Sequence, residues 1–219
     1  AVFSCELPEN KMVYPFPNQK VGIDVGLENF AVMSNGEFVS NPRHLLKSEK
    51  KLKILQRRLS RKVKGSKNRS KARFKVAKIH VNIANQRADF LHKQSRILVQ
   101  RFKTIAVEKL QIKNMVKNHW LAKSINDASW SNFIQMLFYK AVTSGGQLIE
   151  VNPRNTSKNC SSCGTSREMP LSERMFKCSK CGYAGHRDVN ASINILGRAG
   201  LARTITPVDN EPLHSRKGN

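Results

Sequence analysis

A carboxylate interrupts each of two apolar segments of this sequence. Asp24 lies within VGIDVGL and Glu108 within IAVEKL, and both segments are typical of buried strands. A buried carboxylate is costly unless it is paired or bound to a metal ion. A third acid, Asp188, begins an amphipathic segment, and Glu150 in LIEVNP has the same local character as Asp24 and Glu108. The placement of these acids therefore limits which strands can be neighbours.

The segments around the acids predict a mixed sheet. KVGIDVGL over 20–27 indicates a buried strand, and Asn35-Gly36 within FAVMSNGEFVS is a strong hairpin signal. Further strands are expected at 104–110 and 147–153. When a three-strand meander is followed by a fourth strand, the first and fourth can lie side by side. Two of the acids would then meet, and a final helix opening at Asp188 would close the site. This is the RNase H arrangement, so we expect an α/β, RNase H-like fold.

Converging carboxylates suit phosphodiester hydrolysis by two Mg²⁺ ions. Such ions lie about 4 Å apart, and they activate the attacking water and stabilise the leaving oxygen. Simpler interpretations exist for each acid. Asp188 could be a helix N-cap, and Asp24 and Glu108 could reach solvent or pair with cations. The pattern alone does not exclude Glu150 as a member of the set.

Four cysteines form the pattern C-x2-C-x14-C-x2-C: Cys160, Cys163, Cys178 and Cys181. Two such knuckles complete the tetrahedral shell of a structural zinc ion, which leaves no position for water. A redox pair or an iron–sulfur site is the competing interpretation. Paired CxxC motifs also favour a reducing compartment, so we expect a cytoplasmic protein. The nearby His186 is expected at the surface or facing nucleic acid.

The charge of the chain indicates a polyanionic partner. Thirty-nine Lys and Arg face fifteen Asp and Glu, which gives a net charge of +24. Nucleic acid is the expected partner, and a solvated basic surface or a membrane-surface protein is the alternative. No apolar run approaches the roughly 20 residues that a membrane span needs, so no membrane insertion is expected.

Most of the charge falls in a predicted helical hairpin over 43–102. From Arg43 to Lys78 there are sixteen basic residues and one acid, Glu49. Two sets of residues recur at helical spacing on either side of a break at 64–70. The first set is Leu52, Leu55, Leu59 and Val63, and the second is Phe74, Ala77, Val81, Ala84, Ala88, Leu91, Ser95, Leu98 and Phe102. The second set predicts one seam along a helix about 50 Å long. The candidate nucleic-acid contacts are Arg57, Arg58, Arg61, Lys62, Lys64, Lys67, Arg69, Lys71, Arg73 and Arg187.

Two more helices are expected. Trp130, Phe133, Leu137 and Ala141 predict one over about 127–144, and the other opens at Asp188. Trp120 and Trp130 could stack on bases, although aromatic residues at helical spacing usually belong to the core. Arg187 and Asn190 flank Asp188 and could steady a phosphate or a metal ligand, or could serve as surface or capping residues. Cys5 carries no expected role.

Several motifs resemble the TnpB (OrfB) proteins of bacterial insertion sequences. GIDVG, VEKL and HRDVNASINIL resemble that family's catalytic segments, and NPRNTSKNCSSCG with FKCSKCG resembles its inserted zinc ribbon. The resemblance covers about 20–200. It implies a RuvC-like, RNA-guided DNA endonuclease in which Asp24, Glu108 and Asp188 bind the catalytic Mg²⁺ ions. It also implies DNA and guide RNA as partners, with most of an N-terminal guide-binding half absent.

The resemblance gives the following expected division of the chain. A remnant of an upstream domain occupies 1–19, and a nuclease core occupies 20–156. A zinc ribbon follows over 157–185, then the last core helix over 186–202 and a disordered tail over 203–219. A prokaryotic cytosol is the expected location, and the oligomeric state is left open.

Two functions compete with the metal-dependent nuclease. The first is a catalytically inactive nucleic-acid-binding protein or guided DNA-binding repressor of the same family. The second is a basic zinc-ribbon protein of the ribosome or transcription apparatus, which would explain the charge and the cysteines but not acids within apolar strands.

Overall fold

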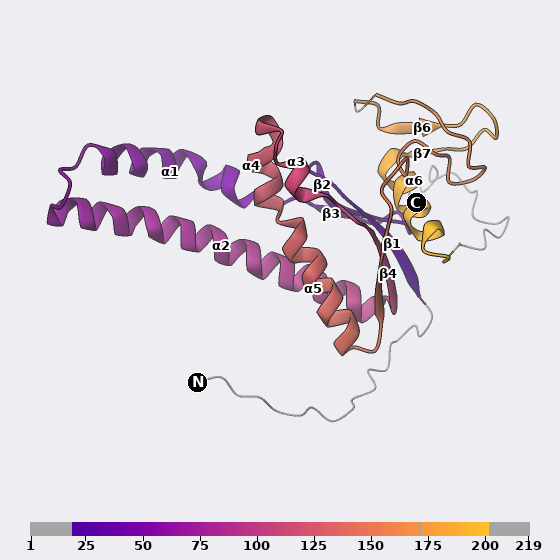
Figure 1. Cartoon of the computed structure of the whole chain (residues 1–219), viewed down its shortest axis with the longest axis horizontal. Helices are drawn as coiled ribbons and strands as arrows, with labels where there is room; N and C mark the ends of the chain where they lie inside the picture. Colours follow the sequence, from indigo (N-terminus) through magenta and orange to yellow (C-terminus); the bar gives the residue numbers. More distant parts are fainter. Residues whose placement is uncertain (1–18, 171, 202–219) are drawn as a thin grey trace, which may run out of the picture.

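A five-stranded mixed sheet forms the centre of the protein (Figure 1). The computed structural model describes residues 19–170 and 172–201 of the 219-residue chain. The sheet order is β3-β2-β1-β4-β5, with the strands β1 (Lys20–Val25), β2 (Asn29–Met33), β3 (Phe38–Ser40), β4 (Thr104–Glu108) and β5 (Gln147–Val151). β1, β2 and β3 form the predicted antiparallel meander, while β4 pairs in parallel with β1 and β5. The predicted α/β class with a mixed sheet is confirmed.

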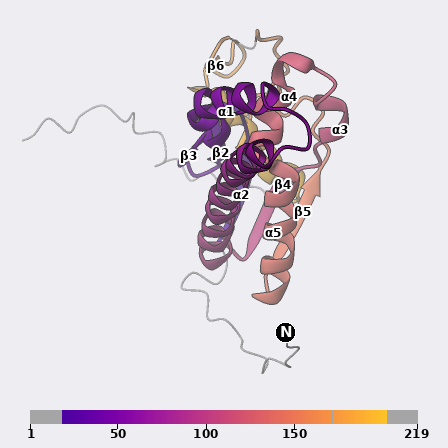
Figure 2. The same ribbon diagram turned by 90° about the vertical axis from the view of Figure 1, so that its left-hand side faces the viewer.

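Helices lie on both faces of this sheet. The described part of the chain contains α1 (His44–Ser60), α2 (Lys67–Arg101), α3 (Ile112–Met115), α4 (His119–Ala128), α5 (Trp130–Thr143) and α6 (Arg187–Arg198). α2 and α5 lie side by side and share the main core with Val21 and Ile23 of β1 (Figure 2). α6 packs on β1, β2 and β4. Because strand side chains alternate between faces, Gly22 and Asp24 lie on the face opposite the main core, where α6 packs.

α6 approaches β1 at Gly22. A Cβ atom at this position would lie 2.0 Å from the carbonyl oxygen of Ser192 and 2.8 Å from the backbone nitrogen of Leu196. The backbone of a packed helix cannot move aside as a flexible side chain could, so only glycine permits this approach. The contact fixes the distance between the strand that carries Asp24 and the helix that carries Asp188.

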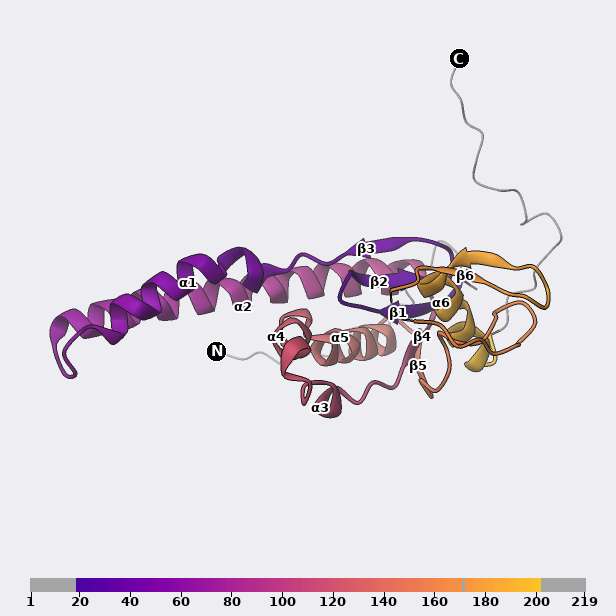
Figure 3. The same ribbon diagram turned by 90° about the horizontal axis from the view of Figure 1, so that it is seen from above.

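α1 and α2 form the predicted hairpin, which extends far beyond the sheet (Figure 3). The two helices meet through Leu52, Ile79 and Ile83, which are buried. α2 is 35 residues long, so at 1.5 Å per residue it spans about 52 Å. The hairpin is therefore a two-helix arm with a small apolar seam of its own.

The predicted seam on α2 is wrong in its first half. Leu91, Ser95 and Leu98 are buried as expected, but Phe74 is 70% exposed and Val81 55% exposed. The positions predicted to form the seam run along the whole of α2 as one stripe, but this stripe contacts the core only near the sheet. Further out, α1 packs against the other side of α2 and leaves the stripe in solvent.

The predicted helix over 127–144 corresponds to α5, which begins at Trp130, and the first two residues of the predicted range end α4. Ser129 adopts a left-handed conformation with φ 54° and separates α5 from α4. The predicted core residues Trp130, Phe133, Leu137 and Ala141 are all buried. α3 and α4 were not predicted. None of the described helices is long and apolar enough to cross a membrane.

Three expectations fall outside the part of the chain that the structure describes. They are the upstream remnant over 1–19 apart from residue 19 itself, the tail over 203–219, and the role of Cys5. These remain sequence-based predictions.

We expect the substitution Gly22→Ala to lower the free energy of unfolding by about 2 kcal/mol or more, because the added Cβ overpacks the contact between β1 and α6. Gly197→Ala is the matched control, since a Cβ at Gly197 in α6 meets nothing within 4 Å. That control should be neutral or stabilising by up to about 1 kcal/mol. Denaturant unfolding of both variants measures the difference, and equal stabilities would contradict the close-approach argument.

Candidate active site and metal centre

Asp24, Glu108 and Asp188 line one cleft of about 530 Å³. The parallel pairing of β1 and β4 places Ile23 opposite Val107, so Asp24 and Glu108 follow side by side on the α6 face. Asp188 lies in the first turn of α6, and the packing of that helix on β1 brings it to the same place. The structure thus gathers the three predicted acids, and their binding of Mg²⁺ stays a prediction.

The interpretation of Asp188 as a helix cap is wrong. The N-cap of α6 is His186, whose Nδ1 accepts a hydrogen bond of 3.2 Å from the backbone N–H of Asp188. The His186 ring also packs edge-on against Phe38, with 5.0 Å between centroids. The Asp188 carboxylate, 3.9 Å from the Arg174 guanidinium, faces the cleft.

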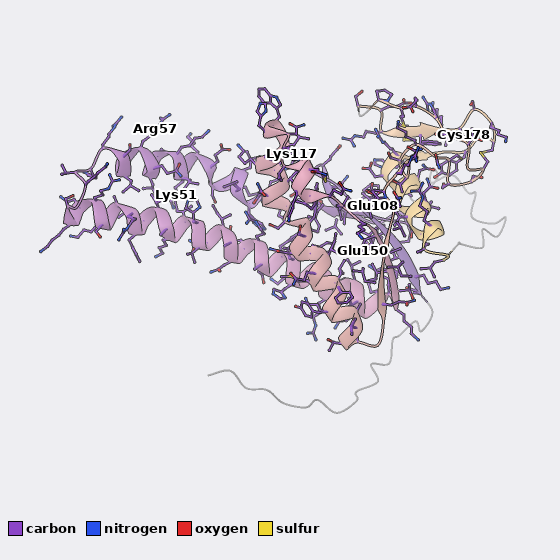
Figure 4. All side chains as sticks on the ribbon, viewed as in Figure 1. Lys51, Arg57, Glu108, Lys117, Glu150 and Cys178 are labelled. Atoms are coloured by element: carbon purple, nitrogen blue, oxygen red, sulfur yellow. The ribbon has the colours of Figure 1, made fainter. Side chains whose placement is uncertain are left out.

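Glu150 does not belong to this group. It is exposed on β5 and lines a separate groove with Leu110 and Phe138. The register of β4 and β5 pairs Glu108 with Val151, so the preceding Glu150 points to the opposite face of the sheet. Figure 4 shows Glu108 and Glu150 on neighbouring strands.

The electrostatics of the cleft oppose ionisation of Asp24 and Glu108. Burial raises the pKa of Asp24 well above its usual value, and the charges of Glu108 and Asp188 raise it further, while Arg187 partly offsets them. Burial also raises the pKa of Glu108, and a hydrogen bond from Thr156 opposes this rise. A site that repels its own negative charges is suited to bind divalent cations, which would neutralise them.

Thr156 is a site residue that the sequence analysis missed. Its side chain is buried, and its hydroxyl donates a short hydrogen bond to Oε1 of Glu108. Its own carbonyl oxygen accepts a hydrogen bond of 2.8 Å from the side chain of Asn194 on α6. Thr156 therefore links β4 to α6. The available signal in the sequence was a polar residue between the strand expected at 147–153 and the first cysteine pair.

Three side chains of α6 bind the cysteine-containing segment. Asn190 is fully buried; its amide donates to the carbonyl of Asn159 at 2.7 Å and accepts from the backbone N–H of Ser161 at 2.8 Å. Asn194 also donates to Asn159, at 2.7 Å. Arg187 is buried and donates to the carbonyl of Pro170 at 2.9 Å. Asn190 is therefore a structural link to this segment. Arg187 is a second such link, and it also lines the cleft.

The four predicted cysteines converge. Their sulfur atoms all lie within 4.8 Å of one another, with 3.7 Å between Cys160 and Cys181 and 3.6 Å between Cys163 and Cys178. A tetrahedral zinc ion with Zn–S bonds of about 2.3 Å requires sulfur separations of about 3.8 Å, so the donor set fits zinc. The side-chain hydrogen bond with Thr165 is the main cause that lowers the pKa of the Cys163 thiol, to about 6, which favours the thiolate ligand.

The surroundings of the cysteines form a small ribbon. Its short strands β6 (Met175–Lys177) and β7 (Ala184–His186) pair antiparallel. Phe176 is fully buried and packs with Met169 and the half-buried Tyr183. β7 leads directly into α6, so the ribbon is continuous with the helix that carries Asp188 (Figure 4, where Cys178 is labelled).

Most of the predicted nucleic-acid contacts are exposed on the hairpin, where Figure 4 labels Lys51 and Arg57. Arg69 differs, because its guanidinium donates to the carbonyl oxygens of Leu59 and Lys62 and so closes the end of α1. Glu49, the one acid from Arg43 to Lys78, contacts Lys53 and also Lys123 of α4. Contact with nucleic acid stays a prediction for all ten residues.

Two family models match the chain. One, OrfB_IS605, is described as "Probable transposase" and matches residues 3–119. The other is described as "Cas12f1-like, TNB domain" and matches residues 130–195, which include the cysteine ribbon and most of α6.

Two relatives of the chain carry the same kind of name. A protein of Streptomyces pristinaespiralis named "Putative RNA-guided DNA endonuclease" is 44% identical over 190 residues, which cover 86% of this chain and 47% of the relative. "Putative RNA-guided DNA endonuclease InsQ" of Escherichia coli K12 is 38% identical over 200 residues, or 83% of this chain and 50% of the relative. The chain thus spans about half the length of these relatives.

A solved structure shares the fold. The one titled "Cryo-EM structure of the Cas12f1-sgRNA-target DNA complex" matches with a TM-score of 0.57 at 20% identity, covering 83% of this chain and 50% of that one. At this identity the likeness concerns the fold alone. With it, the predicted RNase H-like (RuvC-like) fold is confirmed.

We expect Asp24→Asn to stabilise the metal-free protein at neutral pH, because the buried charge is removed. Because the pKa of Asp24 is raised in the folded protein, the folded state binds more protons than the unfolded state at pH values above the ordinary pKa of 3.8. The free energy of unfolding therefore falls as pH rises through the folded pKa. Asn carries no charge, so unfolding curves in chelator from pH 4 to 8 should show a smaller fall for the variant. Glu150→Gln, outside the cleft, should behave as wild type; an unchanged pH dependence in Asp24→Asn would contradict this account.

We expect one zinc ion per chain, and we expect Cys163→Ser to weaken its binding strongly because one of four ligands is lost. Elemental analysis of the purified protein measures the metal content, and thermal unfolding with chelator measures its contribution to stability. Ser162→Ala, a neighbouring exposed position, should keep the zinc. Full zinc content in Cys163→Ser would show that these cysteines do not form the site.

Proposed function

This chain belongs to the OrfB_IS605 family, the TnpB (OrfB) group that its motifs resemble, and on that premise we propose that it carries the nuclease domain of an RNA-guided DNA endonuclease. Its reaction is the hydrolysis of DNA phosphodiester bonds, with Asp24, Glu108 and Asp188 holding two Mg²⁺ ions. The observation that carries the proposal is the convergence of three acids from β1, β4 and α6 in one cleft of a chain with a net charge of +24.

Six residues of the cleft have a role in this proposal. The carboxylates hold the cations, which when bound supply an activated water and stabilisation of the leaving oxygen. Thr156 orients the Glu108 carboxylate by its hydrogen bond. Arg174 and Arg187 line the same cleft and place positive charge beside the position of the phosphate, where charge develops during the reaction. The zinc ion would be structural, because four thiolates close its shell.

The rest of the chain supports binding in this proposal. The exposed basic residues of α1 and α2 track phosphates of DNA or of a guide RNA. The nuclease core comprises 20–156 and 186–202, with the zinc ribbon over 157–185 inserted between its parts. The names of the relatives support guide RNA and target DNA as partners, although the chain spans only about half their length.

We expect Asp24→Ala to reduce cleavage of labelled single-stranded DNA in Mg²⁺ by about a thousandfold or more, since the loss of a metal ligand removes several kcal/mol of transition-state stabilisation. Chelator should abolish cleavage by the wild type. Glu150→Ala removes a carboxylate outside the cleft and should leave the rate unchanged.

Binding of Mn²⁺, followed by calorimetry, gives a second measurement that does not depend on cutting. We expect wild type and Glu150→Ala to bind the ion and Asp24→Ala to bind it far more weakly. Cleavage retained in Asp24→Ala would sink the site assignment. A chain that binds DNA but neither cuts it nor binds Mn²⁺ in the cleft would be the inactive binding protein or guided repressor of the same family.

A further inference from the structure

The two tryptophans of the chain have opposite environments. Trp130 is 3% exposed within the main core, whereas Trp120 is 81% exposed. Spacing along the sequence cannot separate these two cases. Packing in the core explains a buried tryptophan. It does not explain an indole that lies almost wholly in solvent.

Trp120 directly precedes Leu121, a residue that lines the cleft holding the acids. It belongs to the first turn of α4, which projects beyond the neighbouring elements in Figure 1. The next residue, Leu121, is 44% exposed and lines the cleft together with Met115. Pro153 and Thr156 line the same cleft from the segment that leads into the ribbon. A strand that enters the cleft from the side of α4 would pass Trp120.

The surroundings of Trp120 form a fixed aromatic platform with positive charge. Asn118 caps α4 and accepts a hydrogen bond of 3.1 Å from the backbone N–H of Trp120, which holds the start of the helix. The His119 ring lies 4.6 Å from the indole, centroid to centroid, at an interplanar angle of 39°. Lys113 and Lys117 are exposed on the segment leading into α4 (Figure 4 labels Lys117).

We propose that Trp120, beside His119, is a stacking site for an unpaired nucleobase of the nucleic-acid strand that enters the cleft. This inference rests on the proposed nuclease function and names a binding contact for it. Aromatic rings stack on any base, and lysines nearby hold the flanking phosphates. A protein partner is the weaker explanation, because lysine is depleted at protein interfaces and two exposed lysines, Lys113 and Lys117, shortly precede this tryptophan in the chain.

The presence of only two tryptophans makes the site measurable. Intrinsic fluorescence is recorded while oligo(dT) is added in chelator, so that no cutting occurs. Stacking should quench the exposed Trp120. Trp130 also lines the cleft although it is only 3% exposed, so the quenching that is lost in Trp120→Ala is the part assigned to Trp120. An oligonucleotide of the same length with abasic positions keeps the phosphates and removes the bases, and oligo(rU) tests whether the base can come from RNA.

We expect Trp120→Ala to weaken binding of oligo(dT) roughly fivefold to a hundredfold, with no effect on binding of the abasic strand. Trp120→Phe keeps an aromatic face and should restore most of the affinity. Phe138→Ala removes a 56% exposed aromatic from the groove that contains Glu150, and it should bind as wild type. A preference of Trp120 for oligo(dT) over oligo(rU), or the reverse, would assign the stacked base to DNA or to RNA.

Equal affinity of the wild type for oligo(dT) and the abasic strand would overturn the stacking site, as would unchanged binding and quenching in Trp120→Ala. Because the titration contains no divalent ion, its result is separate from the test of the nuclease. A chain that stacks bases but does not cut would refute the proposed function alone. A chain that cuts normally but shows no quenching of Trp120 would refute the stacking site alone and would direct attention to a protein contact.

Discussion

The candidate site depends on holding three carboxylates together, although burial raises the pKa of two of them, Asp24 and Glu108, and the charges of Glu108 and Asp188 raise that of Asp24 further. Asp24 and Glu108 are placed by the parallel pairing of β1 and β4, and Asp188 by the packing of α6 on Gly22. Removal of any of these restraints would let the acids move apart and reach water. The cleft is therefore a locally destabilised region whose cost is offset by the packed core on the other side of the sheet, and a bound cation would remove the repulsion.

The ribbon and the candidate catalytic helix act as one structural unit. Asn190 and Asn194 of α6 bind carbonyl groups just before the first cysteine pair, and Arg187 binds the ribbon loop at Pro170. Thr156, which lies just before the first cysteine pair, donates a hydrogen bond to Glu108. A metal ion that orders the ribbon would thus also order two of the three acids, although its closed shell leaves it no part in the chemistry.

The long helix α2 joins two different environments. Near the sheet, its stripe at Leu91, Ser95 and Leu98 packs into the main core. Further out, α1 packs against a different face through Ile79 and Ile83, and the original stripe is exposed at Phe74. The arm carries basic residues on the solvent side of both helices, so it extends positive charge well beyond the cleft. A stiff arm of this kind keeps a fixed geometry relative to the sheet because one continuous helix connects them.

The sequence by itself determined the class of fold, the cysteine ribbon and the three candidate acids, because each depends on a local pattern: short apolar segments with a hairpin signal, paired CxxC knuckles, and charges placed against the hydrophobic trend. It left Glu150 open as a fourth acid, since strands alone do not reveal which face meets α6. It also gave the wrong buried face for the outer half of α2, because helical spacing marks an apolar stripe without saying what covers it. Thr156, the buried amides of α6 and the contrast between Trp120 and Trp130 were decided only by the tertiary structure, since each depends on a neighbour distant along the chain.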